Sequence, residues 1–132
     1  MRVVLDTNVI VSAFAARGIC SDLYGFCLKE CEIVLSQPIL QEVQTALIQK
    51  LKLPLIKAQL IINFLSDNSH LVIPAIVAAK QCRDKNDLKI LGTAMAANAA
   101  VIVTGDQDLL VIKSFKGIPI LSPRGFWQLI NT

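Results

Sequence analysis

Acidic side chains are the residues of this sequence whose types and spacing point to chemistry. The chain of 132 residues has 10 Asp and Glu residues, and more than half of them fall in four short segments. These clustered acids are Asp6, Glu42, Asp84, Asp87, Asp106 and Asp108. The one histidine, His70, has no partner at metal-ligand spacing, which disfavours zinc chemistry and catalysis by a histidine triad.

Alternating strands and helices must position these acids. Short apolar runs predict strands at Arg2–Leu5, Glu32–Ser36, Val101–Thr104 and Ile118–Leu121, with a weaker strand at Leu71–Pro74. Apolar residues at helical spacing predict helices at Asn8–Ala16, Ser21–Lys29, Pro38–Lys52, Pro54–Leu65, Asn86–Asn98 and Pro123–Ile130. Because parallel strands need crossover helices, this order predicts one α/β domain over residues 1–132, with a central parallel sheet flanked by helices in three layers.

Three of the acids follow predicted strands. Asp6 ends the first strand, and Gly105 permits a sharp turn that leaves Asp106 and Asp108 after the fourth. In open α/β sheets, sites form outside the carboxyl ends of the strands. We therefore expect Asp6 and Asp106 at the same edge of the sheet.

The other acids lie on or before helices. Glu42 is at the margin of an apolar helix face, where a carboxylate is costly to bury unless a partner compensates it. Asp87 is in the first turn of its helix, in line with Ile90 and Leu91, so its side chain should face the core side while Asp84 caps the helix.

Each acid also has an ordinary structural explanation. Asp6 would cap the following helix, and Asp84 with Asp87 would form a helix cap and its reciprocal partner. Glu42 would be a solvated residue at a helix edge, and the pair after the fourth strand would form a turn and a cap. Location is what sets them apart from such residues, because all of them are expected near one edge of the sheet.

Carboxylates gathered in this way repel one another unless cations lie between them. The four acids best placed to converge are Asp6, Glu42, Asp87 and Asp106. Hard oxygen ligands without soft donors favour Mg²⁺ or Mn²⁺, and four such ligands suffice for two ions about 4 Å apart. A site of that kind suits hydrolysis of phosphodiester bonds and needs no histidine.

The acidic segments, in this order, resemble the PIN-domain family of metal-dependent ribonucleases, especially the VapC-like toxins of prokaryotic toxin–antitoxin pairs. The matching segments are Val4–Val9 (VLDTNV), Pro38–Val43 (PILQEV), Arg83–Leu91 (RDKNDLKIL) and Ile102–Leu110 (IVTGDQDLL). The resemblance implies a PIN-like fold and a catalytic, metal-binding site formed by Asp6, Glu42, Asp87 and Asp106. It also implies Mg²⁺ or Mn²⁺ as cofactor, RNA as substrate, an antitoxin partner and association with a second copy.

Further residues have auxiliary or less specific roles. The resemblance implies auxiliary roles for Asn8, Thr104 and Asp108, to which we add Asp84 as a helix cap. Basic residues that could guide RNA, or equally form solvated helix faces, are Lys50, Lys52, Lys57, Lys80, Arg83, Lys85, Lys89, Lys113 and Lys116. The aromatic rings of Tyr24 and Trp127 are expected to pack in the core and not to stack on bases.

Two alternatives to a ribonuclease remain. A haloacid-dehalogenase-like phosphatase also has an aspartate after its first strand, but its second acid and its hydroxyl would fall at Asn8 and Ile10. A PIN-like module could instead bind RNA or protein without cutting it. The acids disfavour this, because a binding module gains nothing from repelling phosphates.

Composition sets broader limits. The net charge of +3 is compatible with a polyanionic partner without requiring one.

The longest apolar run, Leu71–Ala79, is too short for a spanning helix and Asp6 interrupts any signal-like start, so we expect a cytoplasmic protein without a membrane segment. With 54% hydrophobic residues, we expect at least a dimer, built from the helices between Pro38 and Leu65. Four cysteines, Cys20, Cys27, Cys31 and Cys82, are expected to be reduced residues in or near the core.

Overall fold

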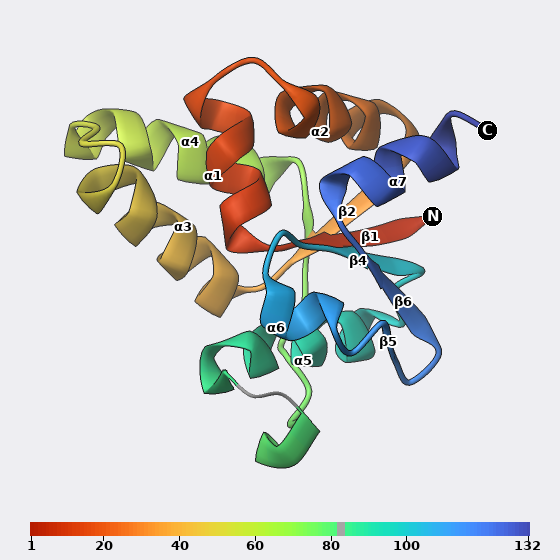
Figure 1. The fold of residues 1–132 in the computed structure, drawn as a ribbon. Coiled ribbons are helices and arrows are strands. Elements are labelled where there is room, and N and C mark those ends of the chain that lie inside the picture. Colours follow the sequence, from red (N-terminus) through yellow and green to blue (C-terminus); the bar gives the residue numbers. More distant parts are fainter. Residues whose placement is uncertain (82–83) are drawn as a thin grey trace.

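A computed structural model describes residues 1–81 and 84–132 (Figure 1). In this part of the chain, six strands form one sheet in the order β3–β2–β1–β4–β6–β5. The strands are β1 (Arg2–Leu5), β2 (Glu32–Leu35), β3 (His70–Leu71), β4 (Val101–Val103), β5 (Ser114–Phe115) and β6 (Ile118–Leu121). Neighbouring strands are parallel except β5 and β6, which are antiparallel. The predicted parallel sheet is confirmed, with a short antiparallel edge that was not predicted.

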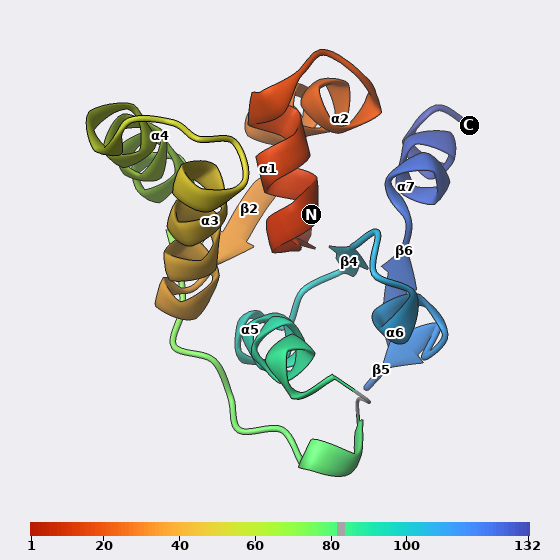
Figure 2. The same ribbon diagram turned by 60° about the vertical axis from the view of Figure 1, so that its left-hand side comes forward.

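Helices cover both faces of this sheet. They are α1 (Thr7–Ala15), α2 (Ile19–Glu30), α3 (Gln37–Gln49), α4 (Leu55–Asp67), α5 (Leu88–Ala97), α6 (Gln107–Leu110) and α7 (Pro123–Ile130), with 3₁₀ turns η1 (Ala79–Gln81) and η2 (Lys85–Asp87). Figures 1 and 2 show α1, α2 and α7 on one side of the sheet and α5 on the other. Helix α3 packs against both α1 and α4. The predicted three-layer arrangement is therefore confirmed.

The core fixes the strand ends that carry the acids. Val4 on β1 is aligned with Val34 on β2 and with Ile102 on β4, and all three side chains are fully buried. A register slip by one residue would turn these apolar side chains away from the face on which they pack. The position of Asp6, directly after β1, is thus set by buried neighbours on both sides.

Most predicted elements are found, with differences at their ends. Ser122 caps α7, because its Oγ accepts a hydrogen bond of 3.0 Å from the Gly125 amide. The weak strand predicted at Leu71–Pro74 is wrong in its bounds: β3 is His70–Leu71, and Pro74, which has no amide proton, lies outside it. The helix predicted from Asn86 begins instead as η2, and α6 and β5 were not predicted.

Two further sequence-based expectations concern cysteines and membrane segments. Cys20, Cys27 and Cys31 are unpaired, whereas Cys82 and Arg83 lie outside the described residues. Over residues 1–81 and 84–132, no individual helix has the length and apolar character to cross a bilayer. The pair α1 and α2 meets that test only jointly, with a bend of 105° between them.

Gly92 on α5 allows a close crossing with the segment that follows β3. The Ala75 amide donates to the Gly92 carbonyl at 2.9 Å, and a Cβ at Gly92 would lie 2.3 Å from the Ala75 oxygen. That distance is far below van der Waals contact and involves backbone, so the two segments would have to separate.

We therefore expect Gly92→Ala to lower the free energy of unfolding by about 1–3 kcal/mol. Gly25→Ala is the matched control, because Gly25 lies within α2 with open space around its Cβ position. That variant should be more stable by about 0.5–1 kcal/mol, since alanine favours helix. Denaturant melts of both variants test this, and equal stabilities would contradict the close crossing.

Candidate active site

Asp6 is held in one orientation at the carboxyl end of β1. Its side chain is buried, with 5% of the residue exposed. One carboxylate oxygen accepts a hydrogen bond of 2.7 Å from the Thr7 amide at the start of α1, and the other accepts one of 2.6 Å from Thr104 Oγ1. The capping role and the site position proposed for Asp6 therefore coexist, because the carboxylate caps α1 while it stays at the sheet edge.

Thr104 connects Asp6 to the acids that follow β4. Its Oγ1 donates to Asp6 and accepts a 3.0 Å hydrogen bond from the Asp106 amide. Asp106 in turn caps α6, since its Oδ1 accepts from the Asp108 amide at 2.9 Å. One hydroxyl thus orients a carboxylate on one strand and the backbone after its neighbour, consistent with the auxiliary role implied for Thr104.

Asp87 completes a group of three carboxylates. It ends η2 with 7% of the residue exposed, while Asp84 caps that turn through a 2.9 Å hydrogen bond from the Asn86 amide. Carboxylate oxygens of Asp6, Asp87 and Asp106 all lie within 4.8 Å of one another. We call these three residues the carboxylate cluster. The predicted division, with Asp84 as the cap and Asp87 facing inward, matches this geometry.

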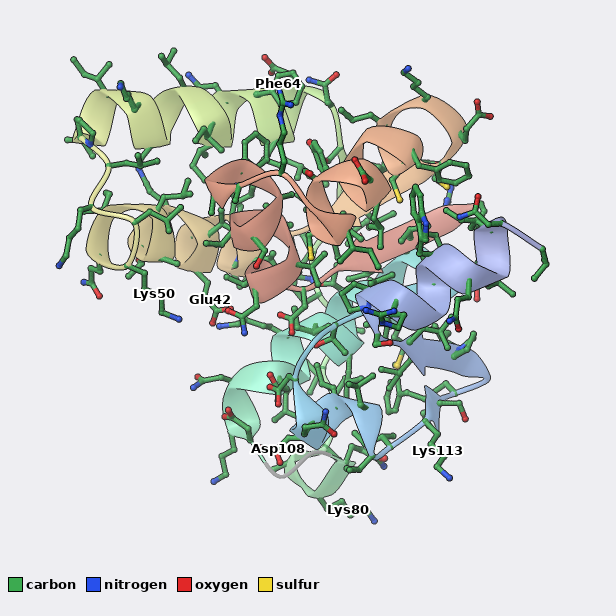
Figure 3. All side chains as sticks on the ribbon, turned by 45° about the horizontal axis from the view of Figure 1, so that its top comes forward. Glu42, Lys50, Phe64, Lys80, Asp108 and Lys113 are labelled. Atoms are coloured by element: carbon green, nitrogen blue, oxygen red, sulfur yellow. The ribbon has the colours of Figure 1, made fainter. Side chains whose placement is uncertain are left out.

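A cavity of about 260 Å³ opens over the carboxylate cluster. The other residues that line it are Thr7, Asn8, Glu42, Thr45, Ala46, Gln49, Lys50, Asp84 and Asn86. Figure 3 shows Glu42 and Lys50 on the same edge of α3. Asp108 does not line this cavity, but its carboxylate lies within 4.8 Å of those of Asp84 and Asp87 in a second group that shares Asp87 with the cluster.

Glu42 faces this cavity without joining the carboxylate cluster. Its Oε1 accepts a hydrogen bond from Thr7 Oγ1, and its Oε2 lies 2.6 Å from the Lys89 ammonium. The expectation that a carboxylate at this helix margin needs a partner is met by Lys89 on α5. Thr7 was missed by the sequence analysis and Lys89 was noted only as a basic residue. Each lies within two residues of a clustered acid in the sequence, and this proximity was the signal that could have identified them.

Burial and nearby negative charge raise the pKa values of two acids of the carboxylate cluster, Asp6 and Asp87. Desolvation is the largest cause of the raised pKa of Asp6. The hydrogen bonds from Thr104 and Thr7 lower this pKa, whereas the charges of Glu42 and Asp106 raise it further. Desolvation, a hydrogen bond with Asp106 and the surrounding carboxylates raise the pKa of Asp87 to about 8. Without a cation, Asp87 therefore keeps its proton near neutral pH.

These residues fit a hard divalent cation. The ligand atoms are all carboxylate oxygens, they converge from three different segments, and a cavity beside them leaves room for water. A cation would also relieve the repulsion that raises the pKa values of Asp6 and Asp87. The cluster could thus hold an ion. If the acids were only helix caps, their carboxylates would not need to converge.

The raised pKa of Asp87 makes the stability of the metal-free protein depend on pH. The folded chain keeps a proton up to a pH of about 8, whereas the unfolded chain releases it near 3.8. Stability in a chelator should therefore fall as the pH rises through this interval. In Asp87→Asn this part of the pH dependence should vanish, because the amide does not titrate. Melting temperatures in chelator from pH 5 to pH 9, at intervals of about one unit, check this; parallel curves for the two proteins would contradict it.

Comparisons with known proteins agree with the fold. The family model described as the PIN domain matches residues 2–108. VapBC2 from Rickettsia felis, bound to a DNA fragment from the promoter, contains a chain that matches at 19% identity with a TM-score of 0.65, covering 92% of this chain and 98% of that one.

Two further solved structures have the same fold. PAE2754 from Pyrobaculum aerophilum matches at 15% identity with a TM-score of 0.66, covering 100% of this chain and 91% of that one. FitAcB from Neisseria gonorrhoeae matches at 16% identity with a TM-score of 0.61, covering 92% of this chain and 98% of that one. No curated protein sequence matches. With strands, helices and clustered acids in the order that the resemblance implied, the chain belongs to the PIN-domain family.

Proposed function

We propose that this protein is a metal-dependent endoribonuclease that hydrolyses phosphodiester bonds of RNA. The observation that carries the proposal is the convergence of Asp6, Asp87 and Asp106 within 4.8 Å beside an open cavity, in a PIN-domain chain. Phosphodiesters are the substrates to which such an arrangement of hard ligands is suited.

The proposed cofactor is Mg²⁺ or Mn²⁺, held by the carboxylate cluster, with Glu42 as the fourth acid of the site. When bound, such an ion activates water and stabilises the charge that develops on the leaving oxygen. Thr104 keeps the Asp6 carboxylate in place through its 2.6 Å hydrogen bond. Asn8 and Asp84 line the cavity and Asp108 lies next to Asp84 and Asp87, which supports auxiliary roles for all three.

RNA is the proposed polymer, and cations near the cavity support this choice. Lys50 lines the cavity from the end of α3, where its charge can attract phosphates. The other basic residues proposed for RNA guidance are spread over several elements, and Arg83 lies outside the described residues.

We further propose that the protein is the toxin of a toxin–antitoxin pair and acts in the cytoplasm. The VapC-like resemblance and the VapBC and FitAcB structures that share its fold support an antitoxin as a partner. The alternative, a PIN-like module without activity, would have to tolerate the mutual repulsion of Asp6, Asp87 and Asp106 for no catalytic gain. The PIN-domain match leaves the phosphatase alternative without support.

Cleavage of RNA should require the divalent cation. We expect the purified protein to cut RNA with Mg²⁺ or Mn²⁺, to stop in chelator, and to leave 5′-phosphate and 3′-hydroxyl ends. Asp6→Asn and Asp87→Asn should each lose activity by about 100-fold or more while remaining folded, because they keep the side-chain shape and remove a ligand charge. Asp22→Asn, on the exposed side of α2, is the control and should stay active.

Mass spectrometry of the products and gel assays provide the measurement. Cyclic phosphate ends, or cleavage that continues undiminished in chelator, would contradict the mechanism. Binding of RNA in Mn²⁺ without any cleavage would favour the non-catalytic alternative.

An apolar stripe on α4 supports the proposed self-association. Ile56, Leu60 and Phe64 recur every four residues, and 76%, 63% and 43% of these residues are exposed. The sequence between Lys57 and Asp67 contains no charged residue. Two copies related by a twofold axis could bury this stripe against itself, so we propose a homodimer through α4.

Leu60→Glu should convert this dimer to a monomer, because it places a charge in the middle of the apolar stripe. Leu129→Glu, at an exposed apolar position on α7, is the matched control and should leave the dimer intact. Light scattering at high micromolar concentration measures the molar mass, and hence the oligomeric state, of both variants. A monomeric parent protein would contradict the proposal.

A further inference from the structure

Both carboxylate oxygens of Glu42 are bound by the protein, and one of them is bound by an ammonium group. Thr7 Oγ1 donates to Oε1, and the Lys89 ammonium lies 2.6 Å from Oε2. About a third of the Glu42 side chain and a quarter of the Lys89 side chain are exposed, so this ion pair lies at the border of the cavity and not in open solvent. A cation is therefore already present beside the fourth acid.

Buried hydroxyl groups fix the distance between the two helices that carry this pair. Thr93 Oγ1 donates to the Lys89 carbonyl at 2.7 Å within α5, and Ser36 Oγ, just before α3, lies 2.8 Å from Thr93 Oγ1. Ser36 and Thr93 are fully buried. The start of α3 and the first turns of α5 are thus tied together, and this tie holds Glu42 and Lys89 within reach of each other.

An ammonium and a second divalent ion would compete for Glu42. Two-metal sites hold their ions about 3.5–4 Å apart, with carboxylates on both. A second ion on the Glu42 side of the carboxylate cluster would need Glu42 as a ligand. It would meet the Lys89 charge at close range, where like charges repel.

We propose that Lys89 is a positioning residue that occupies the place of a second metal ion. It holds Glu42 apart from the carboxylate cluster, so the resting protein binds one divalent ion at Asp6, Asp87 and Asp106. This inference rests on the proposed function, because it presumes that the cluster binds an ion. The Lys89 ammonium supplies a fixed positive charge at the cavity border. In a two-ion site, a second metal ion bound from solution would supply that charge.

Counting bound Mn²⁺ by isothermal titration tests the inference without measuring activity. The parent protein should bind about one ion per chain, and Lys89→Gln should bind about two, because Glu42 is then free to hold the second. Lys89→Arg keeps the charge and should still bind about one. The double variant Lys89→Gln with Glu42→Gln should return to about one, since it lacks both the ammonium and the carboxylate.

Lys50→Gln is the control matched for charge. Lys50 lines the same cavity but is not part of the Glu42–Lys89 pair, so this variant removes the same charge and should still bind about one ion. If it gained a second ion as well, general electrostatics and not Lys89 would be responsible, and the inference would be overturned. Equal stoichiometry and affinity in Lys89→Gln and the parent would also overturn it.

Glu42→Gln decides the question if Lys89→Gln fails to fold, as judged by circular dichroism. Its affinity for the single ion should change by less than about threefold, whereas Asp87→Asn should lose more than about tenfold. A tenfold loss in Glu42→Gln would make Glu42 a ligand of the first ion and reject the role of Lys89. Absence of Mn²⁺ binding in the parent protein itself would instead reject the proposed function.

Discussion

Repulsion among carboxylates that are withdrawn from water is the constraint on which the rest of this structure depends. Asp6 and Asp87 are both nearly inaccessible, and the charge of Asp6 raises the cost of ionising Asp87. A chain folds around such a group only if the surrounding contacts are strong enough to hold the acids together. Here those contacts are the aligned strands β1, β2 and β4, with their buried apolar side chains, and the hydroxyl of Thr104.

The acids reach this position through unequal supports. Asp6 and Asp106 follow neighbouring parallel strands, so the sheet alone brings them to one edge. Asp87 comes from a 3₁₀ turn and depends on Asp84, whose carboxylate caps that turn. The close crossing at Gly92 packs the segment after β3 on the helix that follows Asp87. Strand register and local turn geometry therefore contribute to one site by different physical means.

The sequence predicts the parts of this site that depend on periodicity and on strand ends. Asp6, Asp87 and Asp106 could be placed together because apolar runs locate the strands and helices, and because parallel strands share an edge. The ion pair between Glu42 and Lys89 could not, because it joins two helices whose distance depends on side-chain packing. Periodicity shows which face of a helix is buried but not which residue of another helix faces it. The short β3 and the unpredicted α6 reflect the same limit, since a strand of two residues or a helix of a single turn carries almost no periodic signal.

The contact between Ser36 and Thr93 has a consequence for how the protein responds to its solution. Both groups are buried and neither carries a charge, so dissolved ions do not screen the hydrogen bond that joins α3 to α5. The cavity, in contrast, is lined by charged side chains, whose interactions weaken as ionic strength rises. Salt can thus change what enters the cavity, and how tightly it is held, while the spacing of the helices around it stays the same.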